Sequence, residues 1–424
     1  MRFWSLAIAS LVCGPAWAQE VDGGSFDAGV AEQGELANEI DAAAGLGVKP
    51  STAPSQNPFI RAFQSLNPDI AAIIDSNVGI AGARSYSLAE VDPDLRGGSA
   101  EQPAGFAIQE VEVALQAVVD PYFRADLFLS IPNLRGIEVE EGFVTSSSLP
   151  ANLQVKAGIF RSAIGRENGQ HLHVQDFTRR QLLNEALFSP DGLRSPGLQV
   201  SWVAPLPFFL QVYGEAFSVP KPDSRPHLTT FGGGKRTDLT YTAEVKSFIP
   251  ATETLSVFFG LSAAWGKSAG MEGSDGTIVR EDATTLLQGA DLYVKFKPAN
   301  VVGGYFSLAW TTEFFLRHVL SRDSLESTAI DGSLYSQLVA QVARQWFVGL
   351  RQDLLGVPAS QLQPTVSRTA LSVTFAASEF ARLRAYVERE TLPRPGDFFL
   401  MGKPNWAAYL QLEISIGAHG AHTF

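Results

Sequence analysis

The feature that most constrains this chain is a period-two alternation of apolar and other side chains, which recurs from about residue 70 almost to the C-terminus. In the segment 110–119, for example, Val111, Val113 and Leu115 alternate with Glu110 and Glu112. Side chains of a β-strand point alternately to two faces, whereas a helix repeats about every 3.6 residues. We therefore expect an all-β protein with no long helix.

Soluble sandwiches and outer-membrane barrels share this alternation, so other features must separate the two. Tight connections such as Asp120-Pro121 alternate with loops of roughly 10 to 35 residues, as the periplasmic turns and external loops of membrane barrels do. Aromatic rings, which sit at the lipid headgroup level in such barrels, gather at the tight ends: Tyr122, Phe123, Phe208, Phe209, Phe248, Trp346, Phe347 and Phe380. These features predict a transmembrane antiparallel β-barrel over residues 70–424.

The alternating segments predict about sixteen strands. We expect them near residues 70–82, 107–119, 122–131, 137–145, 153–161, 197–204, 208–217, 238–249, 255–266, 286–297, 304–316, 334–343, 346–354, 368–376, 380–388 and 406–418. An even number places both termini on the periplasmic side. Sixteen strands leave a water-filled lumen rather than a packed interior.

Three segments are expected to precede the barrel. Residues 1–18 read as a signal peptide, with Arg2, an apolar stretch and the cleavage site Ala16-Trp17-Ala18. Residues 19–56 carry seven acidic residues against Lys49 alone and are expected to be a disordered linker. Residues 57–69 begin with Asn57-Pro58 and are expected to form a short amphipathic helix.

Charge and motifs exclude several classes of protein. A net charge of −12 argues against nucleic-acid binding, and a single cysteine excludes a disulfide scaffold. An enzyme is not expected, because no zinc-protease H-E-x-x-H motif and no P-loop occur. The last strand ends in register with Phe424, which resembles the signal read by the barrel-assembly machinery. We therefore expect export to the outer membrane of a Gram-negative bacterium, with contact to its lipid.

Two segments resemble the phosphate-selective porin O/P family of outer-membrane porins. They are 109–126, from Gln109-Glu110-Val111 to Arg124-Ala125-Asp126, and 153–167, from Leu153-Gln154-Val155 to Arg166-Glu167. The resemblance covers about residues 106–215 and implies a porin barrel, a long third loop that narrows the channel, and a homotrimer. Asn67-Pro68-Asp69-Ile70 and His171-Leu172-His173 also resemble barrels labelled zinc-regulated TonB-dependent outer membrane receptors. That label implies a plug domain, for which residues 19–69 are too few.

The loop over residues 162–196 is the longest expected connection and the candidate constriction. Its cations and those at its edge would offer donors to phosphate or carboxylate groups: Lys156, Arg161, Arg166, Arg179, Arg180 and Arg194. The alternative is that these arginines pair with acids of the same loop: Glu167, Asp176, Glu185 and Asp191. Carboxylates on the expected lumen faces of several strands argue against strong anion selectivity.

His171 and His173 lie two residues apart in this loop, so an extended backbone would put both rings on one side. With Glu167 or Asp176 they would form a three-ligand zinc site. The alternative is that both are solvated loop histidines. No other cofactor is expected.

The sequence thus favours a porin-like channel for passive diffusion of small hydrophilic solutes or ions. Two alternatives stay open. One is an energy-coupled receptor for uptake of a metal such as zinc, and the other is a non-conducting structural barrel.

Overall fold

The computed structural model describes residues 69–81, 105–132, 134, 136–188, 192–220, 230–233, 235–268, 271–272, 278–280, 283–298, 305–320, 327–360, 365–394 and 397–417. The expected signal peptide, acidic linker, short helix and C-terminal Phe424 lie outside these residues. Within them, no helix has the length and apolar character needed to cross a membrane.

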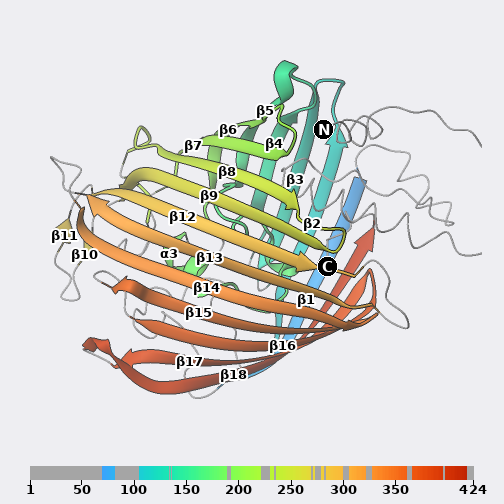
Figure 1. The fold of residues 1–424 in the computed structure, drawn as a ribbon, viewed down its shortest axis with the longest axis vertical. Helices are drawn as coiled ribbons and strands as arrows, with labels where there is room; N and C mark the ends of the chain where they lie inside the picture. Colours follow the sequence, from blue (N-terminus) through green and yellow to red (C-terminus); the bar gives the residue numbers. More distant parts are fainter. Residues whose placement is uncertain are drawn as a thin grey trace, which may run out of the picture.

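Sixteen strands form one closed antiparallel barrel, as the alternation predicted (Figure 1). Each strand pairs with its neighbours along the chain, and β1 closes the ring by pairing with β18. The strands are β1 (Asp69–Ala81), β2 (Gly105–Val118), β3 (Phe123–Pro132), β4 (Glu138–Ser146), β5 (Leu153–Arg161), β6 (Arg194–Val203), β7 (Phe209–Phe217), β8 (Thr240–Pro250), β9 (Leu255–Ser268), β12 (Ala283–Phe296), β13 (Ser307–Leu320), β14 (Ser327–Ala343), β15 (Trp346–Ser360), β16 (Val366–Ser378), β17 (Ala381–Arg394) and β18 (Asp397–Gly417).

Several strands run further toward the long-loop end than the sequence predicted. β14 begins at Ser327 rather than near 334, and β15 continues to Ser360 rather than to 354. The apolar face that reveals a strand in the sequence is needed only where the barrel meets lipid. Backbone hydrogen bonds between strands continue beyond that region, so a strand can be longer than the segment in which apolar and polar side chains alternate.

The barrel wall has an apolar outer face and a polar inner face. Leu198, Val200 and Trp202 of β6 are exposed on the outside, while Gln199 and Ser201 between them are buried on the inside. The same alternation runs through β12, where Leu287, Asp291 and Tyr293 are buried. A wall of this kind satisfies its backbone within the ring and suits a lipid bilayer.

Most aromatic residues at the tight ends lie on the outer face, as expected for rings at the membrane interface. Tyr122, Phe208, Trp346 and Phe380 are exposed. Phe248 is an exception, because the register of β8 and β9 sets it beside the inward-facing Phe258, with ring centroids 4.4 Å apart. Phe209 packs against the same inner cluster, and Phe347 lines a cavity in the lumen. The expectation that Phe209, Phe248 and Phe347 belong to the outer girdle is therefore wrong.

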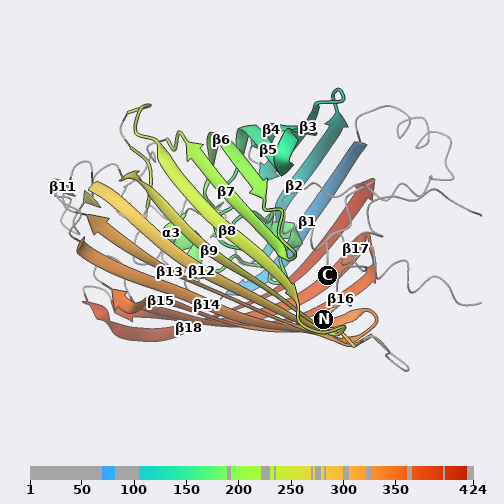
Figure 2. The same ribbon diagram turned by 45° about the horizontal axis from the view of Figure 1, so that its top comes forward.

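Four small elements lie in the described connections. Between β5 and β6 the chain forms a 3-10 helix, η5 (Leu172–Val174), and a short α-helix, α3 (Leu182–Leu187). Figures 1 and 2 show α3 within the ring of strands. A two-stranded hairpin, β10 (Met271–Glu272) with β11 (Ile278–Arg280), extends the connection from β9 to β12 and was not expected from the sequence. The 3-10 helix η4 (Pro150–Asn152) lies in the turn before β5.

Candidate functional site

The connection from β5 to β6, residues 162–193, turns into the barrel, and we name it the inner loop. Most of its described residues are buried, as are Phe160, Arg161 and Ser195 in the strand ends that it joins. Its hydrogen bonds reach strands from β2 around to β18. The inner loop therefore crosses the interior of the ring of strands.

Carboxylates of the wall bind backbone N–H groups at the start of the inner loop. The N–H of Ala163 donates to Glu215 of β7 at 3.0 Å, and that of Gly165 donates to Glu244 of β8 at 3.1 Å. Glu313 of β13 accepts from the N–H groups of the next two residues, Arg166 and Glu167. A buried N–H without a partner is costly, so these acids fix the path of this segment.

Arginines of the opposite wall bind backbone carbonyl groups further along the inner loop. Arg351 of β15 donates to the carbonyl oxygens of Arg179 at 2.9 Å and Arg180 at 3.2 Å. Arg368 of β16 also donates to the carbonyl of Arg180, at 3.1 Å, and Arg384 of β17 donates to that of Gln175, at 2.8 Å. The wall thus binds the backbone of the loop both at its start and near its middle.

Apolar contacts hold α3 against the wall. Leu183, Leu187 and Ile164 of the inner loop share a buried cluster with Phe315 of β13 and Tyr335 of β14. Leu182 and Ala186 share a second cluster with Leu355 and Val366. Burying a leucine side chain contributes about 1.5–3 kcal/mol. The inner loop is consequently part of a packed interior.

The structure distributes the expected loop cations over different partners. Arg179 pairs with Glu388 of β17 at 2.5 Å, and Arg161 pairs with Glu140 of β4. Arg166 stacks on the ring of Tyr293, 3.8 Å from its centroid. The remaining three contact an aromatic ring or a carbonyl group: Lys156 lies over Phe143, Arg180 donates to Gln170, and Arg194 donates to Glu140. The ion pairs of Arg161 and Arg179 thus go to wall carboxylates rather than to loop acids.

His171 and His173 lie together against strands β2 and β4, with ring centroids 5.5 Å apart. The Nδ1 atoms of His171 and His173 are 2.9 Å and 3.3 Å from Oε2 of Glu112. Oε2 of Glu140 lies 3.4 Å from Nδ1 of His171, and Oε2 of Glu141 lies 2.9 Å from its Nε2. The third residue in the group that could hold a metal is Glu112, rather than Glu167 or Asp176.

Burial and charge change the protonation of the inner loop. Burial alone would lower the pKa of His171, but Glu112 and Glu140 outweigh it and raise that pKa well above its ordinary value. Burial raises the pKa of Asp176, although Arg384 opposes the shift. Proton-binding equilibria in this loop therefore depend on groups contributed by the wall.

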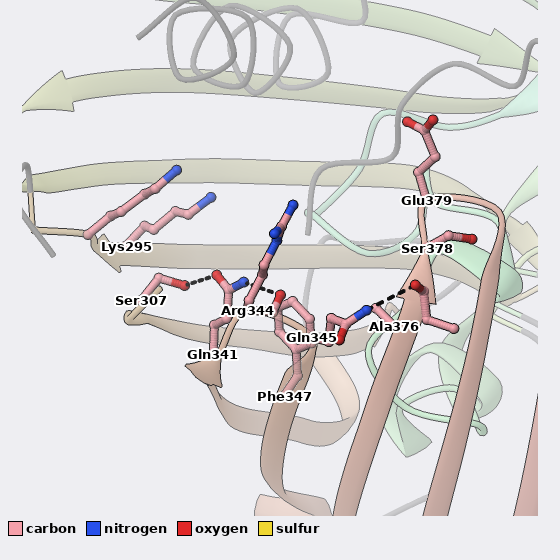
Figure 3. Close-up of a pocket in the computed structure, with 11 residues that line it drawn as sticks. Lys295, Ser307, Gln341, Arg344, Gln345, Phe347, Ala376, Ser378 and Glu379 are labelled. Carbon is pink, nitrogen blue, oxygen red and sulfur yellow. Dashed lines mark hydrogen bonds between the residues drawn. The ribbon is translucent and has the colours of Figure 1, made fainter. Parts of the chain in front are cut away.

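A cavity of about 350 Å³ opens at the tight-turn end of the lumen (Figure 3). Lys295, Arg344 and Glu379 extend into the same region, beside Gln341 and Gln345. Gln341 accepts from Ser307 and donates to the carbonyl of Arg344, so the rim is held by side-chain hydrogen bonds. The mouth thus combines three cations, Lys295, Lys297 and Arg344, with one acid, Glu379.

A short sequence motif begins at the end of β9. Gly266-Lys267-Ser268-Ala269-Gly270 fits the G-x-S-x-G pattern of hydrolase nucleophile elbows. That pattern requires a strand followed directly by a helix, whereas here the next described element after β9 is the strand β10. The match therefore carries no catalytic argument.

The sequence did not single out the residues that hold the inner loop. Arg351, Arg368 and Arg384 occupy inward positions of strands, where the alternation marks them only as lumen residues. Glu112 was expected on a polar face, but its contact with His171 could not be predicted, because the two residues are 59 positions apart in the chain. An arginine at an inward-facing position of a strand was the available sign in the sequence that the residue could bind a loop inside the barrel.

A closed sixteen-stranded barrel with a long connection folded into its lumen has the architecture of an outer-membrane porin. The chain is similar in structure to OprB of Pseudomonas putida, with a TM-score of 0.53, 12% identity and coverage of 84% of this chain and 96% of that one. It is also similar to an anion-selective porin from Comamonas acidovorans, with a TM-score of 0.51, 12% identity and coverage of 82% and 99%. A trimer form of OmpT from Vibrio cholerae matches with a TM-score of 0.51, 9% identity and coverage of 82% and 99%.

Sequence comparison adds a more similar relative. The chain is 29% identical over 395 residues to an uncharacterized protein of Aquifex aeolicus, a match that covers 84% of this chain and 80% of that protein. No family model matches the chain. The structural likenesses establish the porin fold, and this relative shares most of the chain's length.

Proposed function

We propose that the protein is a passive channel of the outer membrane for small hydrophilic solutes or ions, narrowed by the inner loop. The observation that carries the proposal is the combination of an apolar outer wall, a charged lumen and a connection fixed inside that lumen. Pore width then sets the size limit, and lining charges bias which ions remain in the channel. No chemical step is required of the protein.

The contacts of the loop cations support weak rather than strong anion selectivity. Arg161 and Arg179 are compensated by Glu140 and Glu388. Much of the wall they face is acidic, with Glu244 and Glu313 buried in the lumen. Phosphate selectivity, which the resemblance to the porin O/P family implies, therefore has less support here than general diffusion.

Single-channel recording of the refolded protein in a planar bilayer tests the proposal. We expect steady open currents of small amplitude, because the inner loop contacts both sides of the wall. Under a salt gradient we expect a reversal potential well below the value for ideal selectivity. A folded barrel that carries no current would contradict the proposal and leave the structural barrel as the explanation.

We further propose that the protein acts as a homotrimer, as one of the similar structures is described as a trimer form. Export by the N-terminal signal and assembly through the C-terminal strand belong to the same proposal. A metal receptor is the second candidate function, and the histidine cluster is the observation that favours it. Current without any dependence on an energy source would favour the channel over the receptor.

A further inference from the structure

We propose that Glu112, Glu140, His171 and His173 bind a single divalent transition-metal ion, zinc fitting best, where the inner loop meets strands β2 and β4. The inference goes beyond the channel function and does not depend on it, because a metal could hold the loop whether or not the pore conducts.

The geometry fits a tetrahedral ion. Zinc binds imidazole nitrogen at about 2.0–2.1 Å, which places neighbouring ligand atoms roughly 3.3 Å apart. The two Nδ1 atoms lie 2.9 Å and 3.3 Å from Oε2 of Glu112, and Oε2 of Glu140 lies 3.4 Å from Nδ1 of His171. The ligand atoms of Glu112, His171 and His173 lie within 4.8 Å of one another, and Glu140 approaches this group from the side of His171.

Neighbouring side chains that contact His171 and Glu140 hold these two ligands in the required orientation. Nε2 of His171 lies 2.9 Å from a carboxylate oxygen of Glu141. Zinc-binding histidines usually donate their second N–H to such a carboxylate, which leaves the other nitrogen free for the metal. Phe128 packs against the ring of His171, with centroids 4.9 Å apart, and Arg161 binds the Oε1 atom of Glu140. These contacts leave Nδ1 of His171 and Oε2 of Glu140 facing the same point.

An unpartnered buried atom points independently to a ligand. Glu140 is 6% exposed, and among the described residues its Oε2 atom, which lies on the side of His171, has no hydrogen-bond partner. Such an atom loses its hydration without compensation, which is expensive for a carboxylate. A cation bound to this oxygen atom would supply the missing interaction.

The local charge also favours a cation. Glu110, Glu112, Glu140 and Glu141 gather beside the histidines, and Arg161 pairs with Glu140. A divalent ion would offset two of these charges. Imidazole ligands favour zinc, copper or nickel over magnesium or calcium, which prefer oxygen. Because the ligands come from β2, β4 and the inner loop, the ion would tie the loop to the wall.

The test is a titration of the refolded mature protein in detergent with zinc, in competition with a chromophoric zinc chelator. We expect a single zinc ion per chain and no competition from magnesium. The double variant His171→Ala/His173→Ala should weaken zinc binding by more than about 100-fold, beyond the effect of losing an outer partner. Glu141→Gln should weaken it by about 10-fold, as expected for that outer partner.

Two matched variants control for other zinc-binding residues and for folding. His318→Ala removes a histidine of β13, and Glu138→Gln removes an exposed carboxylate of β4. Both should bind zinc as the parent does. The heat-dependent gel shift of a folded barrel confirms folding of every variant, and Glu112→Gln tests a ligand while preserving its shape.

The proposal fails if the folded parent binds no stoichiometric zinc, or if the double histidine variant or Glu112→Gln binds zinc as tightly as the parent does. X-ray absorption of the zinc-loaded protein should show two imidazole ligands, and a site with oxygen ligands alone would also overturn it. None of these measurements uses conductance, so failure of the metal site and failure of the channel are distinguishable.

Discussion

Arg351 provides the sharpest test of how the inner loop is held. The side chain is fully buried, pairs with Asp353 at 2.9 Å, and donates to the carbonyl groups of Arg179 and Arg180. Arg351→Met keeps the apolar stem and removes every donor. The substitution also leaves Asp353 without its ion pair while the loop covers it, and Asp353 accepts from the N–H of Leu182 in the loop, so the two carbonyl bonds give a lower limit for the change in loop attachment.

The magnitude follows from these two hydrogen bonds. A hydrogen bond from a charged donor contributes at least about 1.5 kcal/mol net, which gives roughly 3 kcal/mol for the pair. At 1.4 kcal/mol for each factor of ten, the population with a detached loop should rise at least about 100-fold.

Trypsin cleavage after Arg179 and Arg180 measures that population. Their side chains are buried in the attached loop, so the protease reaches them only after the loop detaches. When opening is fast, the cleavage rate follows the detached population, so Arg351→Met should be cut there at least about 100-fold faster. Arg124→Met is the matched control, because Arg124 also pairs with the acid two residues along its strand, Asp126, at 2.8 Å. If Arg351→Met and Arg124→Met both fold and trypsin cuts them after Arg179 and Arg180 at the same rate, the reasoning is refuted.

Further predictions concern the packing of the loop and the wall. Leu183→Ala leaves a cavity beside α3 and should cost about 2–5 kcal/mol, seen as loss of protease protection at lower urea concentration. Leu261→Arg places a charge on the outer face of β9 and should cost about 2–4 kcal/mol of folding free energy in vesicles, whereas Leu261→Val should fold nearly as the parent does. Gly289→Ala drives a methyl group into the ring of Phe315 and should cost about 1–3 kcal/mol by urea unfolding. Gly214→Ala, whose added methyl group meets nothing within 4 Å, should leave the urea midpoint unchanged.

The alternation of side chains was sufficient to predict the strands, because every strand must offer an apolar face to lipid. It also predicted that the connection between β5 and β6 would be the long one. The exact reach of β14 and β15 could not be predicted, since their outer ends depend on backbone pairing alone. Phe248 was assigned to the wrong face because hydrophobicity alone does not show whether a residue near a turn points into the barrel or out of it.

The surroundings of the inner loop depend on closure of the ring and were beyond the sequence pattern. Thr178 donates to Gln411, a residue 233 positions away, only because β18 lies beside β1. The histidines were recognisable as a pair, but Glu112 joins them through the course of the loop across the lumen. Residue spacing can suggest a pair of ligands within one segment, whereas the rest of a site can come from any strand.

In the inner loop, the groups that fix the position of the loop differ from the side chains that the loop carries, whereas many proteins use the same residues for both. Glu215, Glu244 and Arg351 bind N–H and carbonyl groups, which every non-proline residue possesses. Side chains of the loop can therefore change through mutation while these bonds persist. The wall fixes the position of the loop, and the loop's side chains determine the surface inside the barrel. Substitutions in this one segment could therefore change the interior of such a barrel without rebuilding its wall.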